Sequence, residues 1–227
     1  MSDMGSTDAV RQRGEPGAGA GSNASLADGQ PIVAFDFDGT LTIRDSFTEF
    51  LRWRAGPAGW ALGLVKMAPA VAHYARDRDR GRIKAASVRE FLGGVDRKTL
   101  EAEAERFADA VWDRFMRPDA LECWKAWGDK GAHRVIVTAS PVTTVAPFAK
   151  RLGADALLGT PLFFDADDRV SGAFAGPNCR GPEKVRRLQA AYGPDVRLAA
   201  AYGDTSGDTE MLQIAAEKGF RVFKGRP

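Results

Sequence analysis

Four short apolar runs, each followed directly by polar residues, constrain the fold of this chain more than any other feature of its sequence. The first is Ile32–Phe35, which gives way to Asp36 and Asp38. The other three runs end in the same manner and lie at residues 134–137, 156–158 and 198–202. Short continuous apolar runs of this kind are typical of strands buried in a parallel sheet.

Helical periodicities fill the gaps between these runs. One helix is predicted to end at Gly153 after residues 142–152, and another to end at Gly193 after residues 185–191. The alternation predicts an α/β fold, a Rossmann-like, doubly wound parallel sheet with helices on both faces. Because ligands bind beyond the carboxyl ends of such strands, we expect the polar ends of the four runs to converge on one pocket.

Two segments interrupt this alternation. Residues 43–118 have an almost wholly helical pattern and fall between the first and second strands, so they are predicted to form an inserted helical cap. Residues 161–175 are predicted to form a hairpin around an Asp-rich turn. The Rossmann-like core is assigned to residues 31–42 and 119–227, and residues 1–30 to a disordered tail.

The charge balance and the cysteine content exclude several classes of protein. The 227 residues carry 32 Lys and Arg against 30 Asp and Glu, a net charge of +2, which provides no global positive field for nucleic acid. Only Cys123 and Cys179 are present, too few for a disulfide framework or a zinc site. The first thirty residues hold no apolar run of signal-peptide length, and a cytoplasmic protein is expected.

Carboxylates follow two of the predicted strands. Asp36 and Asp38 are two residues apart in an extended segment, and Asp204 and Asp208 follow the run at 198–202. Mutually repelling carboxylates need a cation, and an oxygen-rich site with few ligands suits Mg²⁺ better than zinc or calcium. One carboxylate can attack a phosphoryl group, and a neighbouring one can exchange protons with the leaving group and with water.

Two further positions offer groups that bind an anion. Thr138 is expected just beyond its strand, where its hydroxyl and nearby backbone N–H groups, at Ala139 for example, can donate to a phosphate. Lys184 is expected in the first turn of a helix opened by Pro182 and offers a compact positive charge. Phosphoryl transfer needs this combination of a nucleophile, a proton carrier and positive charge.

These residues resemble the four ordered motifs of the haloacid dehalogenase superfamily, in its phosphoserine-phosphatase-like branch. The motifs are Asp36-Phe-Asp-Gly-Thr-Leu-Thr, Val-Thr138-Ala-Ser, Lys184 and Gly-Asp204-Thr-Ser-Gly-Asp208. The resemblance spans residues 32–223 and implies a magnesium-dependent phosphatase that works through a covalent aspartyl-phosphate.

The resemblance also implies a role for each residue. Asp36 would be the nucleophile and a magnesium ligand, and Asp38 the general acid and base, touching the metal through its backbone carbonyl. Asp204 would ligate the metal directly, while Asp208 would act on the waters of the metal or hold Lys184. The residues that would bind the phosphate are Thr138, Ala139 and Lys184.

The cap holds the sequence signals for the substrate. Residues 55–72 contain a single charge, Lys66, and residues 76–90 carry six basic side chains against three acidic ones. This pattern resembles an interfacial membrane helix and the cap of bacterial phosphatidylglycerophosphate phosphatases. It predicts a lipid head-group phosphate as substrate and peripheral membrane contact through residues 55–90. A partly buried cap helix is the alternative, because the apolar segment is short and interrupted by prolines.

Other functions stay open. Phosphoserine or another small metabolite is the main rival substrate, since Asp45 matches the position at which phosphoserine phosphatases place a cap-side Glu for the substrate amine. Gly207, by contrast, stands where those enzymes usually carry Asn. Transfer of the phosphoryl group to an acceptor other than water, and a non-catalytic protein that binds a membrane or partner through the cap, are further alternatives.

Overall fold

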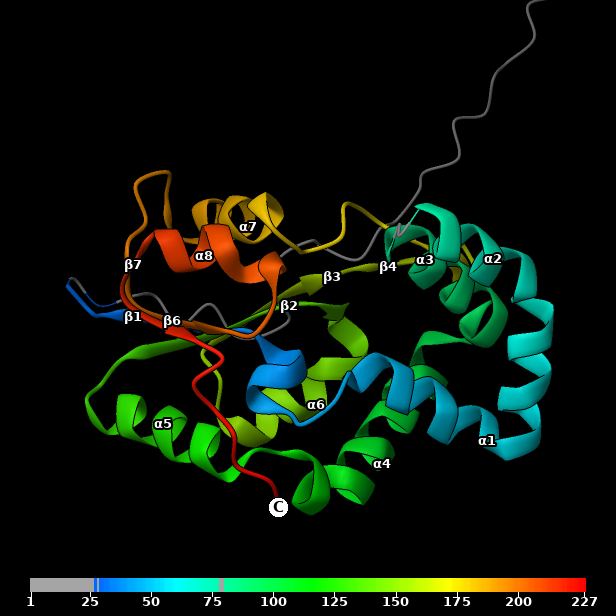
Figure 1. Cartoon of the computed structure of the whole chain (residues 1–227), viewed down its shortest axis with the longest axis horizontal. Helices are drawn as coiled ribbons and strands as arrows, with labels where there is room; N and C mark the ends of the chain where they lie inside the picture. Colours follow the sequence, from blue (N-terminus) through cyan, green and yellow to red (C-terminus); the bar gives the residue numbers. More distant parts are fainter. Residues whose placement is uncertain (1–26, 28, 78–79) are drawn as a thin grey trace, which may run out of the picture.

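A five-stranded parallel sheet forms the centre of the structure, a computed structural model that describes residue 27, residues 29–77 and residues 80–227 (Figure 1). The disordered tail predicted for residues 1–30 falls almost entirely outside the described residues. In spatial order the strands are β3 (Ala156–Thr160), β2 (His133–Pro141), β1 (Ile32–Phe35), β6 (Leu198–Gly203) and β7 (Ala215–Phe220). The chain winds outward from β1 in both directions, which confirms the predicted doubly wound α/β fold and puts the switch point at the end of β1.

Helices cover both faces of the sheet (Figure 1). One face carries α5 (Pro118–Asp129) and α6 (Val142–Leu152), and the other carries α7 (Pro182–Tyr192) and α8 (Thr209–Gln213). Side chains of β1 alternate between two hydrophobic clusters: Val33 and Phe35 pack with α5 and α6, and Ile32 and Ala34 with α7 and α8. As predicted, α6 ends at Gly153, whose φ of 61° is left-handed.

Two features of the sheet differ from the sequence prediction. Strand β2 continues past Val137 to Pro141, because its pairing with β3 resumes at Thr160 after a register shift. Thr138 therefore lies inside the strand and not beyond it. Edge strand β7 was not predicted, because its sequence has no apolar run and three of its six residues in succession are exposed. Backbone pairing with β6 is what defines it.

Of the helices between β1 and β2, the four that precede α5 correspond to the expected inserted cap, and we call them the cap. They are α1 (Ser46–Lys66), α2 (Ala68–Asp77), α3 (Arg80–Leu92) and α4 (Arg97–Phe115). The division of the chain at residues 43 and 118 stays a prediction, because α4 packs against α6 and shares one hydrophobic cluster with it. Within the described residues, no helix is long and apolar enough to cross a bilayer.

The predicted hairpin is present and supports the cap. It consists of β4 (Leu162–Phe164) and β5 (Val170–Phe174), which are antiparallel. Strand β5 packs against α3, and Arg97 of α4 stacks over Phe164 while pairing with Asp168 at 2.8 Å. These contacts join the cap to the core on the side of the sheet edge formed by β3.

Phe148 of α6 joins the core to the cap by aromatic packing. It is fully buried, and its ring meets four aromatic neighbours at centroid distances between 5.3 and 6.2 Å. These neighbours are Phe37, Phe107, Trp112 and Phe115. Three of the four belong to α4, and Phe37 follows Asp36 directly.

Replacing this ring tests how much the junction contributes to stability. We expect Phe148→Ala to lower the free energy of unfolding by about 3–5 kcal/mol, because it removes buried area and leaves a cavity. Urea denaturation measures this loss. Lys150→Ala, at an 82% exposed side chain on the same helix, is the control and should change stability by no more than about 0.5 kcal/mol. A loss below about 1 kcal/mol for Phe148→Ala would contradict the role given to this ring.

The C-terminal segment is fastened by a carboxylate at the start of α5. Asp119 Oδ2 accepts backbone N–H bonds from Lys224 and Gly225 at 2.6 and 2.7 Å. The ring of Phe223 packs against Tyr202 at 5.3 Å between centroids. Burial opposes ionisation of Asp119, but these N–H donors outweigh it and lower the pKa of its carboxyl group.

This lowered pKa sets the sign of a pH effect. The Asp119 carboxylate stabilises the fold above its unfolded pKa of about 3.9, and that contribution is lost as the pH falls through the folded pKa. We therefore expect Asp119→Asn to unfold at lower temperature than the wild type at pH 6, and the difference to shrink toward pH 3. Thermal unfolding at a series of pH values measures it. An equal difference in unfolding temperature at pH 6 and pH 3 would contradict the stabilising role given to the Asp119 carboxylate.

Candidate active site

Asp36 lies at the carboxyl end of β1, at the switch point of the sheet. The backbone N–H of Asp36 donates to the carbonyl oxygen of Tyr202 in β6 at 2.8 Å, and Asp36 is 6% exposed. The chain then reverses in the turn η1 (Phe37–Leu41), where Gly39 has a φ of 80°. A side chain at Gly39 would also collide with the carboxylate of Asp204, so the glycine permits both the backbone conformation and the close approach.

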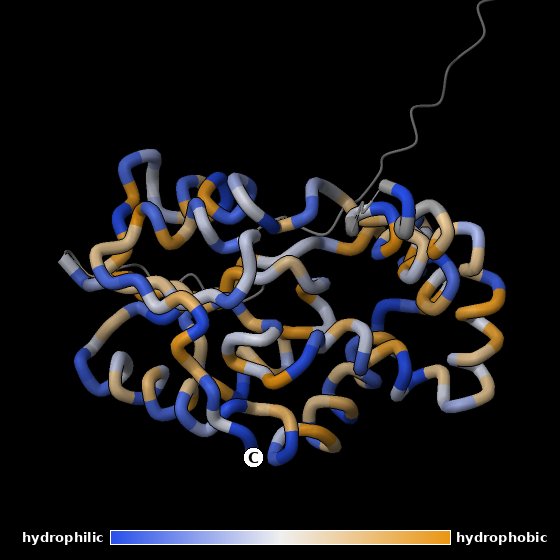
Figure 2. Tube along the Cα trace, in the orientation of Figure 1, coloured by the Kyte–Doolittle hydropathy of each residue, from blue (hydrophilic) through white to orange (hydrophobic). Residues whose placement is uncertain are grey.

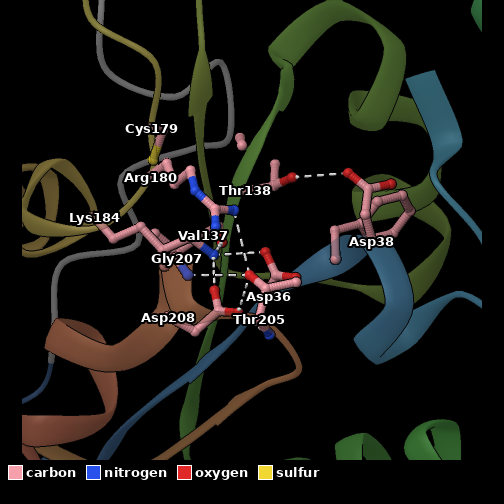
Figure 3. A network of polar contacts seen from close by, with 12 residues as sticks. Asp36, Asp38, Val137, Thr138, Cys179, Arg180, Lys184, Thr205, Gly207 and Asp208 are labelled. Atoms are coloured by element: carbon pink, nitrogen blue, oxygen red, sulfur yellow. Dashed lines mark hydrogen bonds and ion pairs between the residues drawn. The ribbon is translucent and has the colours of Figure 1, made fainter. Parts of the chain in front are cut away.

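Lys184 is buried beside Asp36 and contacts residues that follow β1, lie in β2 and follow β6. Its ammonium donates to Asp36 Oδ1 and to Val137 O, both at 2.5 Å, and pairs with Asp208 Oδ1 at 2.7 Å (Figure 3). Burial disfavours the charged ammonium, but the two carboxylates outweigh this and raise the pKa of Lys184. The residue lies in the first turn of α7, as predicted, and its contact with a phosphate stays a prediction.

Asp208 holds Lys184 in place, which is one of the two roles expected for it. Its Oδ2 accepts from the Thr205 N–H at 2.9 Å and from the Thr205 hydroxyl at 3.0 Å, and Oδ1 pairs with Lys184. Burial works against the charge of Asp208, but the Lys184 ammonium outweighs it and lowers the pKa of the carboxyl group. The side chain is therefore a fixed anion behind Asp36.

Three carboxylates offer a set of oxygens suited to a metal ion. One oxygen each of Asp36, Asp204 and Asp208 lies within 4.8 Å of the others. Asp204 Oδ1 is buried and has no hydrogen-bond partner among the described residues. Burial raises the pKa of Asp36 to about 7, against the opposing charge of Lys184, and it also raises the pKa of Asp204. An oxygen-only set with an unpaired buried carboxylate fits Mg²⁺, and the expected contact of the Asp38 carbonyl with it stays a prediction.

Asp38 points away from this cluster, toward the cap (Figure 3). Its Oδ1 accepts from the Ser46 N–H at 2.6 Å, and its Oδ2 accepts from the Ser140 hydroxyl at 2.5 Å. Burial and the nearby Asp45 carboxylate raise the pKa of Asp38, and the bonds from Ser140 and Ser46 offset part of the rise. A positioned carboxyl group with a raised pKa is suited to giving and taking a proton.

The second predicted motif divides between the protein interior and a cavity. Thr138 is fully buried, and its Oγ1 accepts from the Ser140 N–H at 3.0 Å and approaches Asp38 Oδ2 at 3.5 Å. Ala139 lines the cavity, and its carbonyl accepts from Lys84 Nζ at 2.6 Å. The phosphate contacts expected of Thr138 and Ala139 stay predictions.

A cavity of about 640 Å³ lies between the cap and the core. Its core side carries the carboxylates of Asp36, Asp38 and Asp204. Its cap side is mainly apolar and includes Phe47, Trp60, Leu64, Met67, Val71 and Phe91. The cavity therefore puts an anionic end next to a large apolar wall.

Sequence reasoning missed three cations that line this cavity, Arg44, Lys84 and Arg180. Lys84 was counted among the basic residues of a membrane-facing segment, but in the structure it is directed inward to Ala139. Burial lowers its pKa, against the opposing charges of Asp38 and Asp45. Its helical spacing from Phe91, seven residues on, could have placed both on one face of α3. Arg180 precedes α7, in a run from Asn178 to Lys184 that resembles the phosphatidylglycerophosphate phosphatases, but sequence reasoning gave it no role of its own.

Asp45 lines the cavity but is already engaged by its own helix. Its Oδ1 accepts from the Thr48 N–H at 2.7 Å and caps the start of α1. The residue is exposed, and its predicted contact with a substrate stays a prediction.

Comparisons with known proteins add sequence relatives and solved structures of similar fold. Protein CicA of Caulobacter vibrioides is 57% identical over 196 residues, which covers 86% of this chain and 88% of CicA. Phosphoserine phosphatase SerB1 of Mycobacterium tuberculosis is 28% identical over 193 residues, covering 79% of this chain and 61% of SerB1.

Two solved structures have a similar fold at low sequence identity. A Bordetella pertussis protein of unknown function has a TM-score of 0.68 and 21% identity, covering 81% of this chain and 86% of that one. A phospho-aspartyl intermediate analogue of phosphoserine phosphatase has a TM-score of 0.56 and 19% identity, covering 83% and 85%. Residues 33–213 match the haloacid dehalogenase-like hydrolases, and with the carboxylate site at the end of β1, this chain belongs to that family.

Proposed function

We propose that this protein is a magnesium-dependent phosphatase that hydrolyses a phosphomonoester through an aspartyl-phosphate on Asp36. One observation carries the proposal: Asp36 lines a large cavity at the switch point of the sheet, while Lys184 holds its carboxylate from behind. A carboxylate held in this way can attack phosphorus without losing its orientation.

Asp36 and Asp204, with the backbone carbonyl of Asp38, would hold the magnesium ion, and Asp208 would fix Lys184 behind them. When bound, the ion would supply positive charge to the oxygens of the phosphoryl group. The protein residues carry the remaining steps. The Asp36 carboxylate forms a bond to phosphorus while the bond from phosphorus to the leaving oxygen breaks, and Asp38 gives that oxygen a proton. Water then attacks the acyl phosphate, Asp38 takes a proton from it, and inorganic phosphate leaves with Asp36 restored.

Removing the nucleophile tests this function. We expect Asp36→Asn to lower magnesium-dependent hydrolysis of p-nitrophenyl phosphate by about 10³-fold or more, because the amide has nearly the same shape but cannot form the acyl phosphate. EDTA should abolish the wild-type rate, and added Mg²⁺ should restore it. Asp113→Asn, at an exposed position of α4, is the matched control. Equal rates for Asp36→Asn and the wild type would exclude the proposed nucleophile.

The shape of the cavity favours a phosphate ester with an apolar portion. Leu64 and Val71 line the cavity and are also 42% and 41% exposed, so its apolar wall continues onto the outer surface of the cap. Leu62 and Val65 extend that surface with 57% and 71% exposure. Figure 2 shows mainly apolar residues along this part of α1. Exposed apolar patches of this kind mark interaction sites. A phospholipid head group such as that of phosphatidylglycerophosphate would put its phosphate at Asp36 and its acyl chains at this surface.

Phosphoserine is the second candidate substrate. The 28% identity with SerB1 and the position of Asp45 on the cavity wall favour it. The cap side offers Asp45 and Lys84 to the amine and carboxylate of serine, but most of its lining is apolar and would contact neither group. We therefore prefer the amphiphilic ester, with peripheral contact between the cap and an anionic membrane.

Membrane contact is tested by changing the exposed apolar side chains outside the cavity. We expect the double variant Leu62→Ser, Val65→Ser to weaken binding to phosphatidylglycerol vesicles by about tenfold or more, because both side chains would enter the bilayer surface. Co-sedimentation measures it. Val222→Ser, at a 52% exposed side chain outside the cap, is the control. If the wild type does not bind the vesicles and hydrolyses phosphoserine faster than the lipid phosphate, phosphoserine would replace the amphiphilic ester as the proposed substrate.

A further inference from the structure

The cation that is fixed beside Asp36 directs its donors at protein oxygens. An ammonium has three N–H donors, and those of Lys184 are taken by Asp36, Asp208 and Val137. The residue is 2% exposed and lies behind Asp36, away from the cavity. A phosphoryl group in transfer carries charge on three oxygens, so a cationic group that faces the cavity would add to the donors that Thr138, Ala139 and Lys184 are predicted to supply.

Arg180 is placed to be that group. It lines the cavity together with Asp36 and Thr205. Its guanidinium donates to the hydroxyls of Thr205 and Ser206, at 3.3 and 3.0 Å, and Figure 3 shows it directed toward Thr205. In the described part of the chain no carboxylate pairs with it, whereas Lys84 has the charges of Asp38 and Asp45 nearby. Neutral hydroxyls orient Arg180 but do not neutralise it.

Gly207 makes the space that Arg180 occupies. A Cβ at this position would lie 2.6 Å from both Cγ and Nη1 of Arg180, closer than real contacts allow. The backbone of Gly207 does not need a glycine, because its φ is not among the positive ones. The absence of a side chain at this position therefore serves to let the guanidinium lie over the loop that carries Asp204 and Asp208.

We propose that Arg180 is a catalytic residue that donates hydrogen bonds to the oxygens of the phosphoryl group, and that Gly207 allows it to reach them. The planar guanidinium presents paired donors that match two phosphate oxygens, which a lysine ammonium cannot do. The proposal rests on the phosphatase function given above and adds a contact that the four sequence motifs do not contain.

The test compares Arg180→Met and Arg180→Lys with the wild type on p-nitrophenyl phosphate, glycerol 3-phosphate and 3-phosphoglycerate. We expect Arg180→Met to lower kcat/KM about 10- to 100-fold on all three, the loss expected for a charge-assisted hydrogen bond. The inhibition constant of inorganic phosphate should rise by a similar factor, and Arg180→Lys should recover part of both losses. Arg186→Met, at a 66% exposed arginine of α7, is the matched control and should change neither.

Gly207→Asn provides a second route to the same effect without removing charge. Its side chain should displace the guanidinium and reproduce the loss seen in Arg180→Met. In the double variant the two losses should not add, because both act through one contact. Thermal unfolding shows whether Gly207→Asn folds, and if it does not, the two Arg180 variants still decide the matter.

Two results would overturn the proposal. Unchanged inhibition by inorganic phosphate in Arg180→Met would mean that the guanidinium does not touch the phosphoryl group. A loss confined to 3-phosphoglycerate would mean that Arg180 recognises a second anionic group of the substrate instead. Failure of the phosphatase function itself looks different, because the wild type would then hydrolyse none of the three esters.

Discussion

The buried ammonium of Lys184 is the interaction on which the rest of the site depends. It contacts a carboxylate at the end of β1, a carbonyl within β2 and a carboxylate that follows β6, so one side chain of α7 joins three parts of the chain that meet at the sheet. Breaking a buried ion pair by removing one partner costs about 3–5 kcal/mol, since it leaves an uncompensated charge. The position of Asp36 is therefore determined by the packing of α7 on the sheet.

The same arrangement separates two tasks among the carboxylates. On one side of Asp36, Asp208 and Lys184 form a buried cluster in which the ammonium contacts three protein oxygens. On the other side, Asp38 is held by Ser140 and by the first residue of the cap helix α1, Ser46. The two aspartates are two residues apart in sequence, yet the turn at Gly39 gives them different surroundings. These different surroundings would suit Asp36 to the role of nucleophile and Asp38 to that of proton carrier in the proposed mechanism.

The cap and the core contribute different chemistry to one cavity. The core supplies carboxylates and Arg180, whereas the cap supplies an apolar wall and Lys84, which reaches across to Ala139. The ring of Phe148 packs α6 against α4, so this helix of the cap is in direct contact with the core. Helices α1 and α2 carry the exposed apolar side chains, and we expect their surface to decide which esters enter.

The fold class, the strand ends and the polar residues that follow them could be predicted from local patterns, because buried parallel strands need continuous apolar runs and ligand sites lie at their carboxyl ends. Strand β7 and the extension of β2 could not, since backbone pairing with a neighbour defines them. Lys84 was assigned to the wrong environment because charge alone does not tell which face of a helix is turned inward. Asp36, Asp38, Lys184 and Asp208 were determined as candidates by sequence alone. Only the tertiary structure decided that the Lys184 ammonium contacts Asp36, Val137 and Asp208, and that Arg180 faces the cavity over Gly207. These contacts join segments that are distant in sequence and that only packing brings together.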